Sequence, residues 1–335
     1  MNKATQSKNL LSKLKEKLMS LDNLNDMDKR TILNNILKME KKEINLLITG
    51  ATGSGKSSTI NALFETDAAT VGMSSLPETM DIKKYSLDNL VIWDSPGFGD
   101  GINEDIRHGK GIAKLLNEID QEGHCKIDLV LVLLDGGSRD YGTTYKLLEK
   151  VIMPNIGHND CRILVAINQA DMVMNGKGWD HELNRPTEEL IEQLDAKVKS
   201  TQIRIKENTS VDIKPIYYSA GYQDEFETQR PYNLAKLLHF IVENIPANKR
   251  FKIADNMTTD ENLYATNDDI KDYTNETKKS MAESLMEVLS DVSNAAVDIV
   301  SDTVVKTFNT AVKVGSAIVS AGRSLLSGIA DLFSR

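Results

Sequence analysis

A glycine-rich segment at residues 50–57 has the residue types and the spacing of a phosphate-binding loop. An apolar run at 44–49 precedes it and a helix-like stretch at 58–64 follows it, which is the setting that such a loop requires. There the glycine N–H groups turn toward the phosphates, the Lys56 ammonium reaches the β and γ oxygens, and the Ser57 hydroxyl is offered to Mg²⁺. A chance glycine-rich turn is the alternative. The predicted nucleotide contacts are Gly50, Thr52, Gly53, Ser54, Gly55, Lys56, Ser57 and Ser58.

A second motif, Asp94-Ser95-Pro96-Gly97, ends the apolar run at 90–94. A carboxylate at the end of a strand can face the hydration shell of Mg²⁺, so Asp94 is a predicted metal ligand. Gly97 can bring its N–H close to the γ-phosphate. Because turns of this composition are common at strand ends, the motif gains its weight from its position after the phosphate-binding loop.

Two further motifs point to the base of a nucleotide. Asn168-Gln169-Ala170-Asp171 closes an apolar run at 163–168, at the sheet edge where ligands of such folds bind. The Asp171 carboxylate would accept hydrogen bonds from guanine N1–H and the exocyclic amine, a pattern that adenine lacks, while Asn168 would brace the loops. Ser219 and Ala220 close the last strand and could hold guanine O6 through backbone N–H groups. The order of all four motifs therefore predicts a guanine nucleotide site.

The elements that must position these residues alternate between apolar runs and helical patterns. This alternation predicts an α/β fold of three layers around a mostly parallel sheet, with an antiparallel hairpin at one edge. The expected domains are an N-terminal helical extension at 1–42, the α/β domain at 43–247, a loosely structured linker at 248–279 and an amphipathic helical region at 280–335. The six expected strands are 44–49, 82–86, 90–94, 128–134, 163–168 and 215–219.

Composition excludes some classes of function. The net charge of −9, from 49 acidic and 40 basic side chains, works against a broad grip on phosphate backbones, so direct nucleic-acid binding is not expected. Cys125 and Cys161 lie in a loop and a strand start, which favours reduced thiols and a cytoplasmic setting. Cys161 and His158 lack a second pair of ligands for zinc, and Trp93 and Trp179 are expected to be packing residues.

On these motifs, residues 44–246 resemble an Era-like, HSR1-related bacterial GTPase with a P-loop G domain, and 71–101 and 167–186 resemble the prophage-associated YfjP/YeeP subgroup. The resemblance implies GTP and GDP as ligands, Mg²⁺ as cofactor, hydrolysis of GTP to GDP and phosphate, and a nucleotide-dependent conformational switch. In such proteins a threonine of the first switch closes on Mg²⁺ and the γ-phosphate. Thr79 matches that place, and Thr70 is the competing candidate.

Three positions depart from the family pattern. Gln169 replaces a lysine whose stem covers the guanine ring, and Phe98 stands where many signalling GTPases carry a glutamine that orients the attacking water. Gly53 replaces the asparagine of potassium-activated relatives. These departures predict slow intrinsic hydrolysis, so a second component must complete the site.

The phosphate-binding loop is also similar to those of septin-like and AIG1/Toc-like GTPases, which pair across their nucleotide faces. In Toc-like members an arginine follows the middle strand in a context that Arg139 matches. The resemblance implies a homodimer in which Arg139 reaches the phosphates of the partner. A solvated loop arginine is the alternative.

The C-terminal region admits two interpretations. Between 304 and 330 the only charges, Lys306, Lys313 and Arg323, are basic and accompany a weakly apolar face, which suits peripheral contact with the inner face of an anionic membrane. The same apolar stripe could instead pack against residues 10–37 or a second copy. A GTP-dependent assembly or membrane-associated scaffold with negligible hydrolysis is therefore the alternative function.

Overall fold

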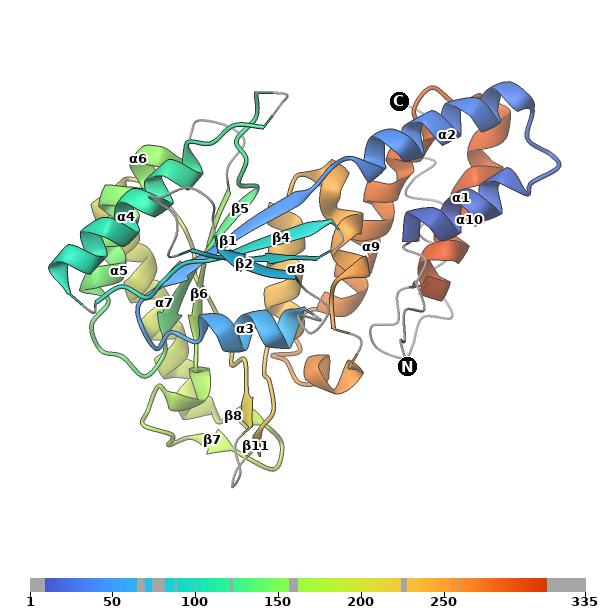
Figure 1. Cartoon of the computed structure of the whole chain (residues 1–335). Coiled ribbons are helices and arrows are strands. Elements are labelled where there is room, and N and C mark those ends of the chain that lie inside the picture. Colours follow the sequence, from blue (N-terminus) through green and yellow to red (C-terminus); the bar gives the residue numbers. More distant parts are fainter. Residues whose placement is uncertain are drawn as a thin grey trace, which may run out of the picture.

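The computed structural model describes residues 10–64, 70–73, 82–87, 89–99, 101–120, 123–156, 162–223, 228–258 and 260–311. Its centre is a twisted sheet between two layers of helices, and a helical extension projects from one side (Figure 1). No helix in the described part of the chain combines the length and the hydropathy needed to cross a bilayer.

The sheet has seven strands in the order β2-β3-β4-β1-β5-β6-β9. All six expected strands are present, and β2, a short edge strand, is the addition. Neighbours from β4 to β9 pair in parallel, whereas β2, β3 and β4 pair antiparallel, so the expected edge hairpin is confirmed. The strands are β1 (Ile44–Gly50), β2 (Thr70–Met73), β3 (Lys83–Ser86), β4 (Leu90–Asp94), β5 (Leu129–Asp135), β6 (Arg162–Asn168) and β9 (Ile216–Tyr217).

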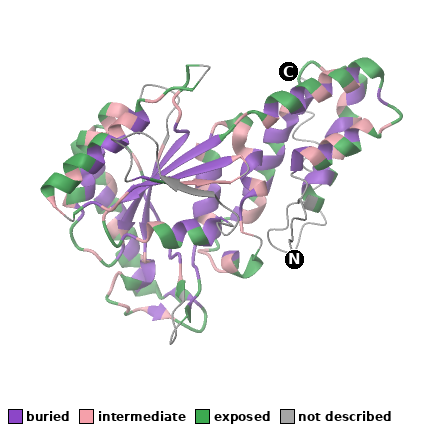
Figure 2. Cartoon of the chain, viewed as in Figure 1, coloured by how far each residue is buried: buried purple, intermediate pink, exposed green. Residues whose placement is uncertain are grey.

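Alternate residues of each strand point to opposite faces of the sheet, and both faces are buried because helices cover each of them. In β1, Leu46 and Ile48 join one apolar cluster and Leu47 joins the other. The first cluster includes α3 (Lys56–Leu63) and α8 (Leu234–Asn244), and the second includes α4 (Ile102–Leu116), α5 (Gly142–Leu147) and α7 (Glu188–Thr209). Figure 2 shows the buried strands between helices whose outer faces are exposed.

Shorter elements complete this domain. A π-helical turn at Leu148–Ile152 continues α5 into α6 (Met153–Asn155). Two small antiparallel hairpins lie at one end of the sheet, and they are formed by β7 (Trp179–Asp180) with β8 (Arg185–Pro186) and by β10 (Tyr222–Gln223) with β11 (Thr228–Gln229).

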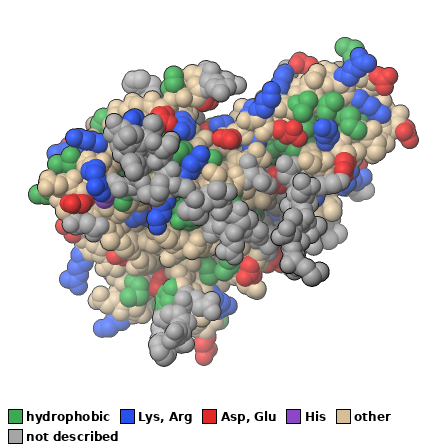
Figure 3. All heavy atoms as spheres, viewed as in Figure 1, with side chains coloured by type: hydrophobic (Ala, Val, Ile, Leu, Met, Phe, Trp, Pro, Cys, Tyr) green, Lys and Arg blue, Asp and Glu red, His purple; other side chains and the backbone are tan. Residues whose placement is uncertain are grey.

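The helical extension joins residues from the two ends of the described chain. Helices α1 (Leu10–Met19) and α2 (Asp26–Glu40) lie within the predicted N-terminal helical extension, and α10 (Asn294–Ala311) packs beside α1. The Asn35 amide in α2 donates to the carbonyl oxygens of Val288 and Ser290, at 3.1 and 2.7 Å. Acidic and basic side chains are interspersed over this extension in Figure 3.

The structure differs from the expected linker at 248–279. Ala247–Asp255 and Glu261–Tyr264 form 3₁₀ helices, and α9 spans Tyr273–Leu285. Phe251 and Ile253 are completely buried in the cluster that also covers α3 and α8. The polar composition conceals these anchors because a 3₁₀ helix lacks the 3.6-residue periodicity by which α-helices are recognised.

The apolar stripe of α10 is buried through the last part that the structure describes. Val300, Val304 and Phe308 are 0–1% exposed and belong to the same cluster as Leu11 and Leu14 of α1. For residues 294–311 this burial agrees with the packing interpretation. Lys313, Arg323 and the rest of the predicted membrane-binding stretch beyond 311 lie outside the described residues.

The buried side chain of Lys252 should make the free energy of unfolding depend on pH. Its side chain is completely buried beside the end of α2, and its Nζ donates to the Glu40 carbonyl oxygen at 3.2 Å. Burial lowers the pKa of Lys252 from 10.5 to about 8, with Asp255 and Glu43 acting in the opposite direction. The unfolded chain therefore holds this proton to higher pH than the folded protein, so the free energy of unfolding should rise between about pH 8 and pH 10.

Lys252→Met should remove this rise, which is on the order of 2 kcal/mol. Urea unfolding followed by circular dichroism at several pH values measures it. Lys110→Met, on the exposed face of α4, is the control and should keep the rise. An identical pH profile in Lys252→Met and the parent protein would refute the assignment.

Candidate functional site

The loop between β1 and α3 has the geometry that its glycines predict. Gly53 and Gly55 have φ values of 80° and 82°, in the left-handed region that favours glycine. A Cβ on Gly55 would lie 2.1 Å from Asn168 Nδ2, so this loop approaches the base motif too closely for a larger residue. The Lys56 ammonium donates to the carbonyl oxygens of Gly50 and Ala51, at 3.3 and 3.0 Å. The loop therefore lies against β6 with its lysine at the start of α3.

Asp94 lies at the end of β4, and the residue is 6% exposed. Among the described residues no group donates a hydrogen bond to its Oδ1 atom. Burial raises the pKa of Asp94, and the nearby Lys56 and Lys83 ammonium groups oppose that rise. A buried carboxylate oxygen without a partner, close to Lys56, is an available ligand for a cation.

Gly97 connects this motif to the phosphate-binding loop. A Cβ on Gly97 would lie 2.1 Å from Thr52 Oγ1 and 2.6 Å from Thr52 Cα, so only glycine fits this approach. Thr52 N–H donates to the Phe98 carbonyl oxygen at 3.0 Å, and Phe98 N–H donates to the Gly50 carbonyl oxygen at 3.3 Å. The Phe98 ring is buried edge-on against His108, with ring centroids 6.0 Å apart. Phe98 is thus a packing residue, and its backbone fixes the two loops.

Asn168 bridges the loops, as the sequence predicts. Its Nδ2 donates to the Ser54 carbonyl oxygen at 3.1 Å, and its Oδ1 accepts from the Ala220 N–H at 2.9 Å. The Gln169 amide donates to the Gly53 carbonyl oxygen at 2.9 Å, so this shorter substitute for lysine lies against the phosphate-binding loop. Asp171 is buried, and its Oδ1 has no hydrogen-bond partner among the described residues. Asp171 thus retains an acceptor for a ligand.

The loop that carries Arg139 lies beside the base motif. Gly136 N–H donates to the Asn168 carbonyl oxygen at 2.7 Å. The Lys197 ammonium of α7 donates to the carbonyl oxygens of Gly136 and Ser138, at 2.6 and 2.7 Å, which holds the loop in place. Arg139 itself is exposed to solvent. Its predicted role therefore depends on a partner molecule.

Oxygen atoms suited to Mg²⁺ are available at the start of α3. Magnesium sites in nucleotide-binding proteins use one or two protein oxygens together with substrate phosphates. The exposed Ser57 hydroxyl and the Asp94 carboxylate fit that donor set, and no group of three His, Cys, Asp or Glu side chains forms a metal cage in the described residues. Thr79 lies outside the described residues; Thr70 begins β2, and its side chain is not described.

A buried hydroxyl pair joins α3 to the end of β9 and was not predicted. Thr59 Oγ1 and the Tyr218 hydroxyl lie 2.6 Å apart, and both residues are completely buried. The pair fixes the helix that begins at Lys56 relative to the loop at Ser219. An apolar run ending in two tyrosines carries no sequence signal for such a bond.

The remaining predicted residues have structural roles or fall outside the description. Trp93 and Trp179 are buried, the former donating to Asn45 Oδ1 and the latter stacking edge-on against Tyr232, so both are packing residues as predicted. Cys125 is half-buried, and His158 and Cys161 lie outside the described residues.

Comparison with known proteins identifies the class of the central domain. Residues 45–169 match the sequence profile of the MMR_HSR1 family, described as 50S ribosome-binding GTPase. Interferon-gamma-inducible GTPase 10 of Mus musculus is 42% identical over 69 residues, which are 18% of this chain and 16% of that protein. Neuronal-specific septin-3 of Danio rerio is 32% identical over 104 residues, which are 26% of this chain and 28% of that protein.

The chain thus covers less than a third of the length of each of these curated relatives. Among solved structures, the LeoA bacterial dynamin GTPase from ETEC matches with a TM-score of 0.40 and 16% identity, over 89% of this chain and 46% of that chain. Distant similarity to septins confirms the resemblance predicted from the phosphate-binding loop, while the Era-like and YfjP/YeeP assignments stay predictions. Residues 45–169, which lie in the α/β domain, are therefore similar in sequence to a GTPase family.

Proposed function

We propose that the protein hydrolyses GTP to GDP and phosphate with Mg²⁺ and changes conformation with the bound nucleotide. The observation that carries this proposal is the meeting of four loops at the carboxyl edge of the sheet, where Asp94 Oδ1 and Asp171 Oδ1 are buried and have no hydrogen-bond partner within the described part of the chain. Phosphates and metal at one end, and guanine at the other, would supply those partners. Water is the acceptor of the phosphoryl group.

Each residue has a defined task in this proposal. The N–H groups of the phosphate-binding loop and the Lys56 ammonium stabilise charge on the phosphates, and Gly97 N–H faces the γ-phosphate. Asp94, Ser57 and a switch threonine, Thr79 or Thr70, would hold Mg²⁺, which supplies further charge stabilisation when bound. Asn168 fixes the loops, and Asp171 accepts from guanine N1–H and the amine. The N–H groups of Ser219 and Ala220 donate to the Tyr232 carbonyl oxygen and to Asn168 Oδ1 in this structure, and they would be shared with guanine O6 when the base is bound.

A homodimer through the nucleotide face would complete the site with Arg139. Phe98 is buried and cannot hydrogen-bond to water, so this chain lacks a water-positioning side chain at that place. Arg139 is exposed on a loop whose backbone is bonded to Asn168. An arginine supplied by a partner stabilises the charge that develops during phosphoryl transfer.

Single-turnover GTP hydrolysis across a range of protein concentrations tests this dimer. The rate should rise with concentration, and Arg139→Ala should remove the rise, with a loss of about 100-fold or more at high concentration. Arg30→Ala, exposed on α2, is the matched control. A concentration-independent rate that Arg139→Ala leaves unchanged would eliminate the dimer.

The second candidate is a GTP-dependent scaffold with negligible hydrolysis, favoured by the buried Phe98 and the large helical extension. The same experiment separates the two functions, because a scaffold would bind GTP while its hydrolysis never exceeds the background. Contact of the C-terminal region with a membrane remains part of this second candidate. Within α10, Val304 and Phe308 pack against other helices and are not available for such a contact.

A further inference from the structure

Asn233 is a buried junction between the nucleotide domain and the segment that leads to α9. Its side chain is 0% exposed, and its φ of 56° lies in the left-handed region at the start of α8. The Nδ2 atom donates to the Tyr217 carbonyl oxygen at 3.1 Å, and the Oδ1 atom accepts from Asp268 N–H at 2.8 Å. Asn233 N–H donates to the Thr266 carbonyl oxygen at 2.9 Å. One residue therefore fastens the edge strand β9 to residues 266–268.

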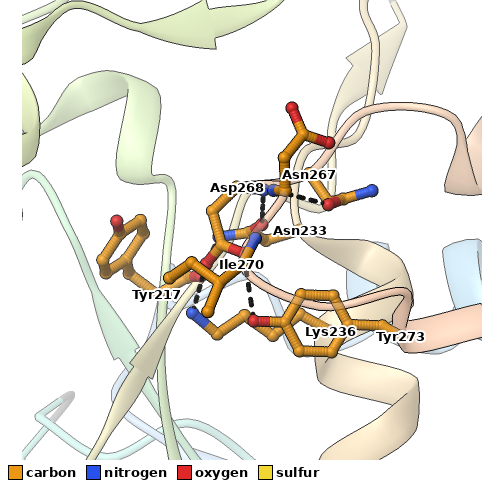
Figure 4. A network of polar contacts seen from close by, with 8 residues as sticks. Tyr217, Asn233, Lys236, Asn267, Asp268, Ile270 and Tyr273 are labelled. Carbon is orange, nitrogen blue, oxygen red and sulfur yellow. Dashed lines mark hydrogen bonds and ion pairs between the residues drawn. The ribbon is translucent and has the colours of Figure 1, made fainter. Parts of the chain in front are cut away.

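A cluster of three charged and aromatic side chains, Lys236, Asp268 and Tyr273, lies beside Asn233. Figure 4 shows Asp268 between Asn233, Lys236 and Tyr273. The Asp268 carboxylate pairs with the Lys236 ammonium and accepts from the Tyr273 hydroxyl at 3.0 Å. The Lys236 ammonium also lies 5.2 Å from the ring centroid of Tyr217, in cation–π geometry. These side chains border a cleft of about 960 Å³ along the open edge of β9.

The junction continues directly into the loop proposed to hold guanine O6. Ser219 and Tyr232 exchange two backbone hydrogen bonds, each 2.9 Å long, immediately before Asn233. Ala220 N–H then reaches Asn168 Oδ1 at 2.9 Å. The position of Ser219 and Ala220 is thus set from two sides, by Asn168 within the site and by Asn233 outside it.

We propose that Asn233 is a positioning residue for guanine recognition. It acts through its bond to Tyr217 and through the Ser219–Tyr232 backbone pair. The Lys236–Asp268–Tyr273 cluster keeps Asn233 in place. The inference rests on the proposed base site. It adds a determinant of base affinity that lies outside the four motifs. Loss of the junction should release the loop that contacts O6 and leave the contacts of Asp171 with N1–H and the amine in place.

Competition binding with GDP and 6-thio-GDP tests the inference, because the sulfur analogue changes only the O6 acceptor and retains the partners of Asp171. Asn233→Gly removes the side-chain bonds and keeps a residue that tolerates the left-handed backbone. Affinity for GDP should fall about tenfold, whereas affinity for 6-thio-GDP should fall less than about threefold. The preference for GDP, which is the ratio of the two affinities, should therefore decrease. An equal loss for both nucleotides would mean that Asn233 only supports the fold and would overturn the proposal.

Two further variants complete the experiment. Asp291→Gly, at an exposed position with a φ of 60° in the helical extension, is the matched control and should change neither affinity. Tyr273→Phe removes only the hydroxyl bond to Asp268 and should decrease the ratio of GDP affinity to 6-thio-GDP affinity about twofold. This variant provides the test if Asn233→Gly does not fold. An unchanged preference in Tyr273→Phe and Asn233→Gly overturns the proposal.

Asp171→Asn, measured in parallel, separates this inference from the proposed base site. If Asp171→Asn weakens guanine binding while Asn233→Gly keeps the GDP preference, only the junction is refuted. If Asp171→Asn leaves guanine binding intact, both the proposed base site and the proposed role of Asn233 are refuted.

Discussion

Lys56→Ala should lower the affinity for GTP by about 100-fold and reduce hydrolysis to the background rate. The ammonium group stands at the start of α3, held over the loop by the carbonyl oxygens of Gly50 and Ala51. Lys56 is the basic side chain of the phosphate-binding motif, so its removal takes away the positive side-chain charge that this loop brings to the phosphates. Titration with a fluorescent GTP analogue and single-turnover hydrolysis measure the two effects.

Lys110→Ala removes a lysine from the exposed face of α4 and should leave both quantities unchanged. Thermal unfolding of the Lys56→Ala protein should stay close to that of the parent, because the ammonium is partly exposed. Parent-like GTP affinity in a folded Lys56→Ala protein would show that the loop is a structural turn and would remove the basis of the proposed chemistry.

Asp171→Asn should shift the preference from guanine to xanthine nucleotides. One oxygen of the buried Asp171 carboxylate has no partner among the residues that the structure describes, and guanine presents two donors to such an acceptor. An asparagine amide brings a donor to that place, which matches the additional carbonyl of xanthine and opposes the guanine amine. We expect GDP affinity to fall about 100-fold and XDP affinity to rise, because an unpaired polar group in a buried site is costly.

Competition binding of GDP, XDP and ADP measures this shift. Asp291→Asn makes the same chemical change at an exposed position of the helical extension and should alter none of the three affinities. Retention of guanine preference by Asp171→Asn would place the base elsewhere and would also remove the basis for assigning O6 to Ser219 and Ala220.

The four motifs could be predicted because β1, β4, β6 and β9 are apolar runs that each end in a motif. β1, β4, β5 and β6 are buried on both faces, so their sequences contain few polar interruptions. The meeting of the motifs follows from parallel topology alone, since the carboxyl ends of parallel strands share an edge. The bridging role of Asn168 follows from the same argument, and its bonds to Ser54 and Ala220 confirm it.

The rest depends on tertiary contacts that leave no local pattern. Strand β2 is short and lies at the edge, and the burial of Phe251 and Ile253 occurs in 3₁₀ turns within a polar stretch. The bond between Thr59 and Tyr218 joins residues 159 positions apart. From the sequence, Asn233 cannot be distinguished from other loop asparagines. Its partners in β9 and at 266–268 become its neighbours only after the sheet has formed.

The packing of α1 beside α10 also has a consequence during synthesis. Leu10, Leu11 and Leu14 are translated nearly three hundred residues before α10, the helix that packs beside them. At elongation rates of about 5–20 residues per second, tens of seconds pass between the synthesis of this apolar face and the synthesis of α10. We therefore expect the part of α1 that packs against α10 to stay uncovered by that helix during synthesis, and docking of α10 to complete its burial.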